Sequence, residues 1–337
     1  MMPDDPSAPA AGGTWHAAGG DLQLAVERPV GTLLDELGTI EVAGADAASF
    51  LHSQLTNDVL HTDALRVQRN GYCTAKGRLL VTIDLWRQGE AICLELPREI
   101  LAPLAKRLSM FVLRAKARLA DASEQWAAFA LLGPGVGAAL RAAGAGLPEP
   151  EDTVAVGSLR LTRAPAGTRL AERYVLRGPR ADVAAWQQRL GLPQVASGVW
   201  WWSQIDAGLP TVFAATQEKF VPQMINYEVL AGVGFKKGCY PGQEVVARSQ
   251  YLGKLRRRMG LAHVTGDTQA AADVFAEGGA DPIGQVVLAA AAPGGGMDLL
   301  YECPQEQAAT QPLRVGHAGG ALLQPRPLPY AIVDVTA

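Results

Sequence analysis

The sequence predicts an α+β protein of more than one domain. Segments that alternate apolar and polar residues, as half-buried strands do, are interleaved with segments of helical periodicity, and their order is mixed rather than a regular strand–helix repeat. A chain of 337 residues, of which 48% are hydrophobic, is long enough for two or three cores. We therefore expect α+β domains rather than a doubly wound parallel sheet.

The first half of the chain supplies most of these elements. Residues 79–85 place Leu79, Val81 and Ile83 on one face and Thr82 and Asp84 on the other, which predicts a strand with one wet face. By the same reasoning, strands are predicted over residues 37–43, 91–96 and 111–119, and helices after Asp46 and from Pro97 to Leu108.

The second half contains two matching segments and a change of pattern. Ala130 to Pro134 and Val175 to Pro179 each end a predicted strand in Gly-Pro, where the proline opens a helix. Ser197 is a candidate N-cap for a helix with three consecutive tryptophans. After Met259, short strand candidates, among them residues 283–288 and 331–335, alternate with Gly- and Pro-rich turns, which predicts a small β-barrel.

Composition and charge argue against several classes of protein. A formal net charge of −3 disfavours a dedicated duplex-DNA binder. No apolar run approaches the roughly 18 residues of a membrane span, and the N-terminus lacks the pattern of a signal peptide, so we expect a disordered tail and a cytoplasmic protein with no membrane partner. The four cysteines, Cys73, Cys93, Cys239 and Cys303, are widely spaced, which is typical of reduced thiols rather than disulfides or a zinc site.

The segment from Phe235 to Met259 is the most unusual part of the chain. It carries seven Lys or Arg residues against one Glu, and Cys239 follows two lysines. Because nearby cations stabilise a thiolate, Cys239 is a candidate nucleophile, metal ligand or redox sensor. The alternative is a small cysteine packed in a tight turn, and composition favours neither. The basic strip from Lys236 to Arg258 is either a solvated face, which is the commoner case, or a surface for an acidic partner such as RNA.

Two further groups are candidates for binding or support. Trp200, Trp201 and Trp202 cannot all face one core from a single helical turn, so at least one is expected at a domain interface or in a ligand cavity, where indole stacks on flat rings. Gln243 and Glu244 are expected to hold the turn around Cys239, with Gly242 at positive φ. His52 and His61 have no companion at ligand spacing and are expected to be surface or capping residues.

The run KKGCYPGQEVVAR, from Lys236 to Arg248, resembles the signature of the YgfZ-type folate-binding proteins, bacterial relatives of a mitochondrial iron–sulfur assembly factor. The similarity continues upstream, in Ile205 to Pro210 and Phe220 to Glu228, and near the N-terminus, in Gly44 to Asp46, Gln54 to Asp58 and Lys76 to Arg78. It spans most of residues 35–260.

This resemblance implies the fold of the T-protein of the glycine cleavage system, an aminomethyltransferase that uses tetrahydrofolate. That fold has three domains around a central hole for the folate, the last being a β-barrel. The implied ligand is tetrahydrofolate or a derivative, and the implied partners are iron–sulfur proteins or their assembly factors, including an iron–sulfur tRNA-modifying enzyme. The implied folate-binding residues are Trp200, Glu172, Gly238, Tyr240, Gly242, Gln243 and Arg248, with Trp200 against the pterin. The implied functional residues are Cys239, Lys237 and Glu244.

The resemblance also implies a division of the chain. The expected parts are a disordered tail over 1–25, an N-terminal α+β domain over 26–122, a middle α+β domain over 123–195, a signature segment over 196–254 that returns to the N-terminal domain, and the β-barrel over 255–337.

Two departures from the transferase pattern bear on activity. Where the transferase has a paired Asp-Asp after the glycine that corresponds to Gly77, this sequence has Leu80 and Val81, and Asp84 lies further along the strand. A methylene transfer that needs a carboxylate against the folate nitrogen is therefore disfavoured. Some relatives also have a second Trp where Leu37 stands here, so a two-sided aromatic clamp would be incomplete.

The sequence thus predicts a folate-binding accessory protein that uses Cys239 in iron–sulfur cluster assembly or repair and in tRNA modification, rather than a conventional enzyme. Two alternatives remain open. One is a folate-dependent one-carbon transferase, and the other is a non-enzymatic RNA- or protein-binding module that works through the basic strip.

Overall fold

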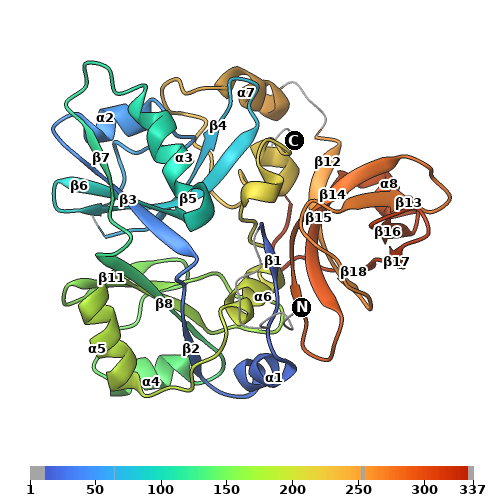
Figure 1. The fold of residues 1–337 in the computed structure, drawn as a ribbon, viewed down its shortest axis with the longest axis horizontal. Coiled ribbons are helices and arrows are strands. Elements are labelled where there is room, and N and C mark those ends of the chain that lie inside the picture. The colour runs from blue at the N-terminus through green and yellow to red at the C-terminus, as the bar shows by residue number, and fades with distance from the viewer. Residues whose placement is uncertain (1–11, 64, 252–254, 333–337) are drawn as a thin grey trace, which may run out of the picture.

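The computed structural model describes residues 12–63, 65–251 and 255–332. Within these ranges the chain forms two five-stranded sheets, each covered by helices, and an eight-stranded C-terminal sheet (Figure 1). The two smaller sheets lie one above the other in this view, and the C-terminal sheet stands beside them. The α+β class predicted from the sequence is confirmed.

The first sheet is antiparallel and has the strand order β4-β5-β6-β3-β7. Its strands are β3 (Leu37–Ala43), β4 (Gln68–Cys73), β5 (Leu79–Gln88), β6 (Ala91–Pro97) and β7 (Arg118–Asp121). Two helices, α2 (Ala47–His52) and α3 (Arg98–Ser109), accompany it. Helix α3 buries Ile100, Leu101, Leu104 and Leu108, whose spacing places them on one face.

The second sheet is also antiparallel, in the order β2-β8-β11-β10-β9. Its elements are β2 (Val30–Leu33), β8 (Trp126–Leu132), β9 (Thr153–Val156), β10 (Leu159–Arg163) and β11 (Arg173–Pro179), with α4 (Val136–Ala142) and α5 (Arg180–Leu190). As predicted, β8 and β11 each lead through Gly-Pro into a helix. The first strand, β2, comes from the segment assigned to the N-terminal domain, so the chain enters the second sheet before it builds the first.

The C-terminal sheet is a nearly closed barrel, as the sequence predicted. Its elements are β12 (Arg257–Val264), β13 (Asp273–Ala276), β14 (Pro282–Ala291), β15 (Met297–Pro304), α8 (Gln305–Thr310), β16 (Leu313–Val315), β17 (Ala321–Leu322) and β18 (Gln324–Arg326). The strand order β17-β16-β13-β14-β15-β12-β18 is antiparallel throughout. The two ends of this path, β17 and β18, are separated in the chain only by Leu323, which brings the edges together.

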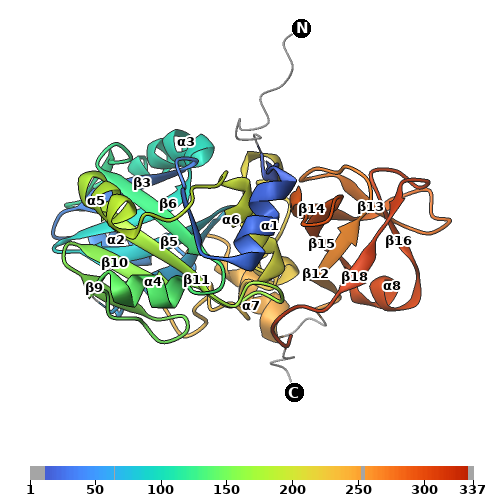
Figure 2. The same cartoon turned by 90° about the horizontal axis from the view of Figure 1, so that it is seen from below.

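The segment between the second sheet and the barrel lies among all three sheets (Figures 1 and 2). It contains α6 (Gly198–Asp206), the short 3-10 helices η1 (Ala214–Thr216) and η2 (Pro222–Ile225), and α7 (Gln243–Tyr251). It returns to the first sheet, where Leu79 N donates to Phe220 O at 2.8 Å and the Tyr227 hydroxyl donates to Asn70 O at 2.7 Å. Near the barrel, Asn226 Nδ2 donates to Met259 O at 3.0 Å.

The N-terminal segment differs from the disordered tail predicted over residues 1–25. Strand β1 (Thr14–Trp15) pairs in parallel with β14, and α1 (Gly19–Glu27) buries Leu22 and Ala25. Trp15 stacks on Trp201, with ring centroids 4.9 Å apart. The prediction of disorder is therefore wrong from Gly12 onward. The segment is held by a few isolated apolar residues, and these give no periodic pattern in the sequence. Residues 1–11 lie outside the described part of the chain.

Three strand predictions also need correction. Residues 111–117 form turns after α3 rather than a strand, and Leu113 is 87% exposed with a φ of 46°. The face of β5 that carries Thr82 was predicted to face solvent. Thr82 is instead buried, because this face forms a wall of a cavity. The strand predicted over 331–335 lies mostly outside the described residues, and Ala331 and Ile332 are not in a strand. No helix in the described ranges is long and apolar enough to cross a membrane.

The barrel is joined to the rest of the protein through the buried carboxylate of Asp298 on β15. Oδ2 of Asp298 accepts hydrogen bonds from Trp202 Nε1 and Arg326 Nη1, both at 2.9 Å, and also pairs with Arg169. Oδ1 of Asp298 lies 3.0 Å from Nδ1 of His263. Trp202 belongs to α6, Arg326 to β18 and His263 to β12, and Arg169 lies in the loop that precedes β11. One carboxylate therefore connects four parts of the structure.

We predict that Asp298→Ala lowers the free energy of unfolding by about 3–5 kcal/mol, because it leaves buried cationic and indole donors without their acceptor. Chemical denaturation followed by circular dichroism measures this change. Asp281→Ala, which alters an exposed carboxylate on the same barrel, should change the free energy by less than about 0.5 kcal/mol. Equal stability of the two variants would contradict the role assigned to Asp298.

Candidate functional site

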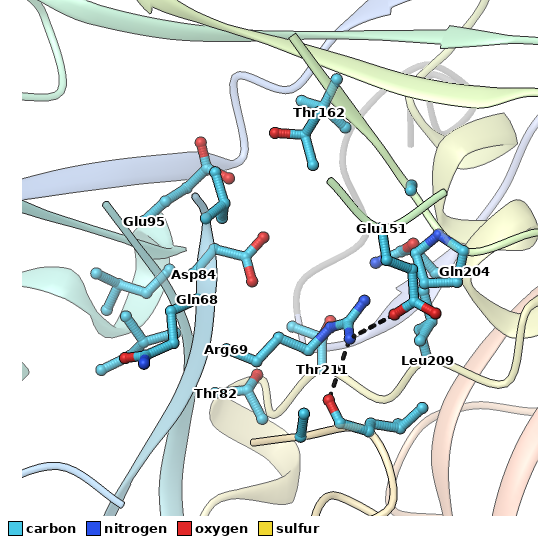
Figure 3. Close-up of a pocket in the computed structure, with 18 of the residues that line it drawn as sticks. Gln68, Arg69, Thr82, Asp84, Glu95, Glu151, Thr162, Gln204, Leu209 and Thr211 are labelled. Carbon is cyan, nitrogen blue, oxygen red and sulfur yellow. Dashed lines mark hydrogen bonds and ion pairs between the residues drawn. The ribbon is translucent and has the colours of Figure 1, made fainter. Parts of the chain in front are cut away.

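A cavity of about 370 Å³ lies between the first two sheets and α6. Small-molecule sites in proteins measure roughly 300–1,000 Å³. The cavity is lined by residues of β4, β5, β6, β10, β11 and α6, and by the segments 209–211 and 227–231. In Figure 3, Asp84 and Glu95 lie on one side of it and Glu151 and Gln204 on the other. Its position at the junction of the two sheets makes it the candidate ligand site.

Three charged residues from two sheets meet at one wall of this cavity. Arg177 of β11 donates from Nε to Glu95 Oε1 at 2.9 Å and from Nη2 to Asp84 Oδ2 at 2.9 Å. Arg177 and Glu95 are buried, whereas the side chain of Asp84 is 36% exposed. Burial raises the pKa of Glu95, and Arg177 opposes this rise. The wall therefore combines a shielded ion pair with a carboxylate that a ligand can reach.

Two of the three tryptophans of α6 line the cavity. The sequence predicted that at least one of the three would lie in a ligand cavity or at a domain interface. Trp200 and Trp201 are only 4% and 1% exposed, so a rim of each indole faces the cavity rather than a full ring face. The guanidinium of Arg173 covers Trp200 at 4.9 Å from its ring centroid. Trp202 instead donates to Asp298 beneath the barrel. Leu37 also lines the cavity.

Behind this wall, Trp201 donates its indole N–H to the carboxylate of Glu36. Burial raises the pKa of Glu36 to about 7, although hydrogen bonds from its backbone, Trp201 and Ser197 oppose the rise. Glu36 is consequently a carboxyl that titrates near neutral pH next to a cavity residue.

The more exposed part of the cavity carries arginines and a polar crosslink. Arg69 Nη1 donates to Glu151 Oε2 at 3.4 Å and to Leu230 O at 3.1 Å, which connects β4 with the second sheet and with the segment after η2 (Figure 3). Arg66 and Arg163 line the same region. Three arginines and the carboxylates of Asp63 and Glu151 therefore share this part of the lining.

The cysteine turn is held by close backbone packing. Gly242 has a φ of 80°, and a Cβ added there would lie 2.3 Å from Thr74 O and 2.7 Å from Cα of Gly77. Only glycine fits this approach, which brings the turn after β4 against the start of α7. The positive φ expected at Gly242 is therefore observed. Glu244 does not hold the turn, because it is exposed and pairs with Arg248 at 3.0 Å on the surface of α7.

Cys239 differs from the other cysteines in its environment. Cys73, Cys93 and Cys303 are buried, and burial raises the pKa of each to about 12, so they remain protonated at neutral pH. Cys239 is exposed. Among the residues that the structure describes, no three His, Cys, Asp or Glu side chains are grouped to bind a metal ion. Cys239 is thus an accessible single thiol.

Lys237 links this thiol to α2. Its ammonium donates to the backbone oxygens of His52 and Leu55, the latter at 2.5 Å, and lies 4.9 Å from the ring centroid of Tyr240. Burial lowers the pKa of Lys237 to about 8, and electrostatic interactions with Asp58 and Cys239 oppose the fall. Nδ1 of His52 lies 3.2 Å from Oδ1 of Asp58, so His52 has a neighbour that the sequence did not indicate.

Fewer cationic side chains of the basic strip are free to bind an acidic partner than the sequence suggested. Arg258 is buried and pairs with Glu228, and Arg257 donates from Nη2 to Glu302 Oε2 at 2.8 Å. Lys237 is occupied by backbone carbonyls. Lys254 lies outside the described residues. The strip is therefore not a continuous free surface for an acidic partner.

The structure brings only one of the predicted folate-binding residues to the cavity, namely Trp200. Glu172 caps the start of α4 instead, where its Oε1 accepts from Gly135 N at 3.0 Å and its Oε2 from Gly137 N at 2.6 Å. The remaining residues of the predicted set, Gly238, Tyr240, Gly242, Gln243 and Arg248, belong to the cysteine turn and α7 and do not line the cavity.

The two regions are nevertheless neighbours through one short segment. Lys237 binds the end of α2, and Asn57 and His61, a few residues further on, line the cavity. Sequence reasoning missed Glu95 and Arg177 and left Asp84 as an exposed strand residue. The one feature of the sequence that could have indicated these three residues is that each is a charged residue within a strongly apolar strand.

Two sheets around a junctional cavity, with a nearly closed barrel beside them, define a protein with the glycine-cleavage aminomethyltransferase fold. The structure aligns over 91% of its length with 87% of the crystal structure of glycine cleavage system aminomethyltransferase T from Bartonella henselae, with a TM-score of 0.72 and 15% sequence identity. At this identity the likeness shows the fold alone.

Sequence similarity to curated proteins is more specific. The tRNA-modifying protein YgfZ of Colwellia psychrerythraea is 31% identical over 227 residues, which cover 67% of this chain and 69% of the relative. That of Edwardsiella ictaluri is 32% identical over 237 residues, covering 67% and 68%. The chain belongs to the YgfZ family, as the cysteine signature indicated. No family model matches the chain.

The titration of Glu36 predicts a pH dependence of stability. Its folded pKa of about 7 lies above the ordinary value of 4.5, so the native state binds more protons than the unfolded state between these values. The free energy of unfolding should therefore fall as pH rises from 5 to 8, by on the order of 2–3 kcal/mol from this group. Denaturation of the wild type and Glu36→Gln at both pH values measures it. The variant should lack this part of the fall, and parallel pH profiles would contradict the assignment.

Proposed function

We propose that this protein is a folate-binding accessory protein that supports iron–sulfur enzymes, including those that modify tRNA. The observation that carries the proposal is a ligand-sized cavity at the junction of the first two sheets, combined with a single accessible cysteine on a separate surface. Membership of the YgfZ family, whose curated relatives are named tRNA-modifying proteins, supports the link to tRNA.

The cavity suits a reduced folate in its chemistry. A pterin ring offers N–H donors, and the cavity wall offers the reachable carboxylate of Asp84. Apolar lining from Leu37, Trp200 and Trp201 suits the ring system, and the arginines at the exposed part suit the carboxylates of the glutamyl tail. Bound there, a reduced folate would supply one-carbon or redox chemistry, while the protein residues bind, orient and shield it.

An aminomethyl transfer is the less favoured function. Leu80 and Val81, which stand where the transferase has its carboxylates, are buried in the core of the first domain. They have no group that can accept or donate a proton. We infer that folate occupancy, rather than turnover at those positions, is the property that the fold retains here.

Cys239 is proposed to act on a protein partner rather than on the folate. It is exposed and does not line the cavity, and the Lys237 ammonium lies in the same turn. The segment from His52 to Asn57 contacts the turn and leads into the cavity wall, which provides a physical route by which folate binding can influence the thiol.

Binding of tetrahydrofolate should be saturable and should change tryptophan fluorescence, because Trp200 and Trp201 line the cavity. Trp200→Phe should reduce the fluorescence change, whereas Cys239→Ala should leave the dissociation constant unchanged because Cys239 lies outside the cavity. Titration calorimetry provides the affinity independently of fluorescence. A flat titration by both methods would contradict folate binding.

Replacement of the thiol tests the second half of the proposal. Cells whose own copy carries Cys239→Ala should lose activity of their iron–sulfur tRNA-modifying enzymes, because the exposed thiol is the group proposed to act. Activity is measured as the level of modified nucleoside in tRNA. Ser249→Ala in α7 serves as the matched control and should behave as the wild type. Full function of the Cys239 variant would make the cysteine structural.

A further inference from the structure

The wall formed by Asp84, Glu95 and Arg177 brings three charged side chains together at the cavity. Asp84 of β5 and Glu95 of β6 are directly opposite each other in the antiparallel ladder. Like charges at such a position destabilise a sheet. Arg177, from the second sheet, offsets the two carboxylates only partly, since three charges leave a net charge of −1. A group that is costly for the fold and faces a cavity is a candidate for ligand binding.

The hydrogen bonds within this group leave specific atoms unused. Nε and Nη2 of Arg177 contact the carboxylates of Glu95 and Asp84 at 2.8–2.9 Å. In the part of the chain that the structure describes, Oδ1 of Asp84 and Nη1 of Arg177 have no hydrogen-bond partner. The wall therefore presents a free acceptor beside a free donor, and both are held by an ion pair that spans two sheets.

The other carboxylates near the cavity are already engaged. Glu151 accepts from Arg69, and Asp63 Oδ1 accepts from Leu65 N at 2.8 Å. Glu36, behind the wall, accepts from Trp201. Asp84 also has one oxygen in a hydrogen bond, and it differs from Glu95 on the same wall in being reachable, with 36% of its side chain exposed against 6%.

We propose that Asp84, oriented by Arg177, recognises the 2-amino-4-oxo edge of a pterin ring. This edge carries adjacent N–H donors next to a carbonyl oxygen, which complements a carboxylate next to a guanidinium N–H. The inference rests on the proposed folate-binding function and names the residues that read the pterin. Asp84 occupies a strand position different from those of Leu80 and Val81, so the carboxylate has a binding role distinct from the proton transfer of the transferase pattern.

The test compares two ligands and two variants by titration calorimetry. The ligands are tetrahydrofolate and its 2-desamino-2-methyl analogue, which lacks the exocyclic amine. Wild type should bind tetrahydrofolate about 30-fold more tightly than the analogue, as expected for a lost hydrogen bond to a charged group. Asp84→Asn, which keeps the shape of the side chain, should weaken tetrahydrofolate binding by about the same factor and the analogue by less than about threefold. Asp267→Asn, an exposed barrel residue, is the matched control and should behave as the wild type.

Each outcome decides a different point. Equal wild-type affinity for both ligands, undiminished discrimination in Asp84→Asn, or equal weakening of both ligands would overturn the role of Asp84 and leave folate binding intact. No binding of either ligand to the wild type would instead contradict the proposed function. The wild-type comparison does not depend on how Asp84→Asn folds, and the thermal midpoint of that variant shows whether its affinities describe a folded protein.

Discussion

The bond network of Arg177 is the constraint on which the ligand site depends. A single guanidinium on β11 crosses from the second sheet to carboxylates on two adjacent strands of the first, and it is buried at the contact. Because an isolated buried charge is strongly unfavourable, the two sheets are held at the spacing that satisfies all three groups. This spacing leaves a cavity between the two sheets, with Asp84 at its edge. Trp200 and Trp201 of α6 line the same cavity.

The remaining architecture separates this cavity from the exposed thiol of Cys239. Gly242 and Gly77 bring the cysteine turn against the end of β4, and Lys237 fastens it to α2, so the turn lies on the outside of the first domain. On the other side, Asp298 connects the barrel to α6 and thereby supports the tryptophan wall from behind. A protein organised in this way has a ligand-sized cavity inside and an exposed thiol on a separate surface.

Local sequence patterns predicted much of the framework. The strand over Leu37–Ala43, the hairpin of β5 and β6, the helix with Ile100 and Leu104, and the positive φ of Gly242 all follow from periodicity or from residue chemistry. Patterns failed where burial was decided by distant segments. Residues 111–117 alternate like a strand but form turns with Phe111 and Leu113 exposed, and β1 and α1 are ordered by contacts with β14 and α6 rather than by their own periodicity.

The sequence by itself determined the α+β class, the barrel, the family and the cysteine motif, because these depend on local order and on residue type. It could not determine which charges share a site. Asp84, Glu95 and Arg177 are separated in the chain and meet only when the two sheets pack together. Glu172 and the residues around Cys239, which the family resemblance grouped with the ligand, are instead directed elsewhere by helix capping and by the path of α7. Only the tertiary structure decides such questions, since the energy of a buried charge depends on its neighbours in space and not on its neighbours in the chain.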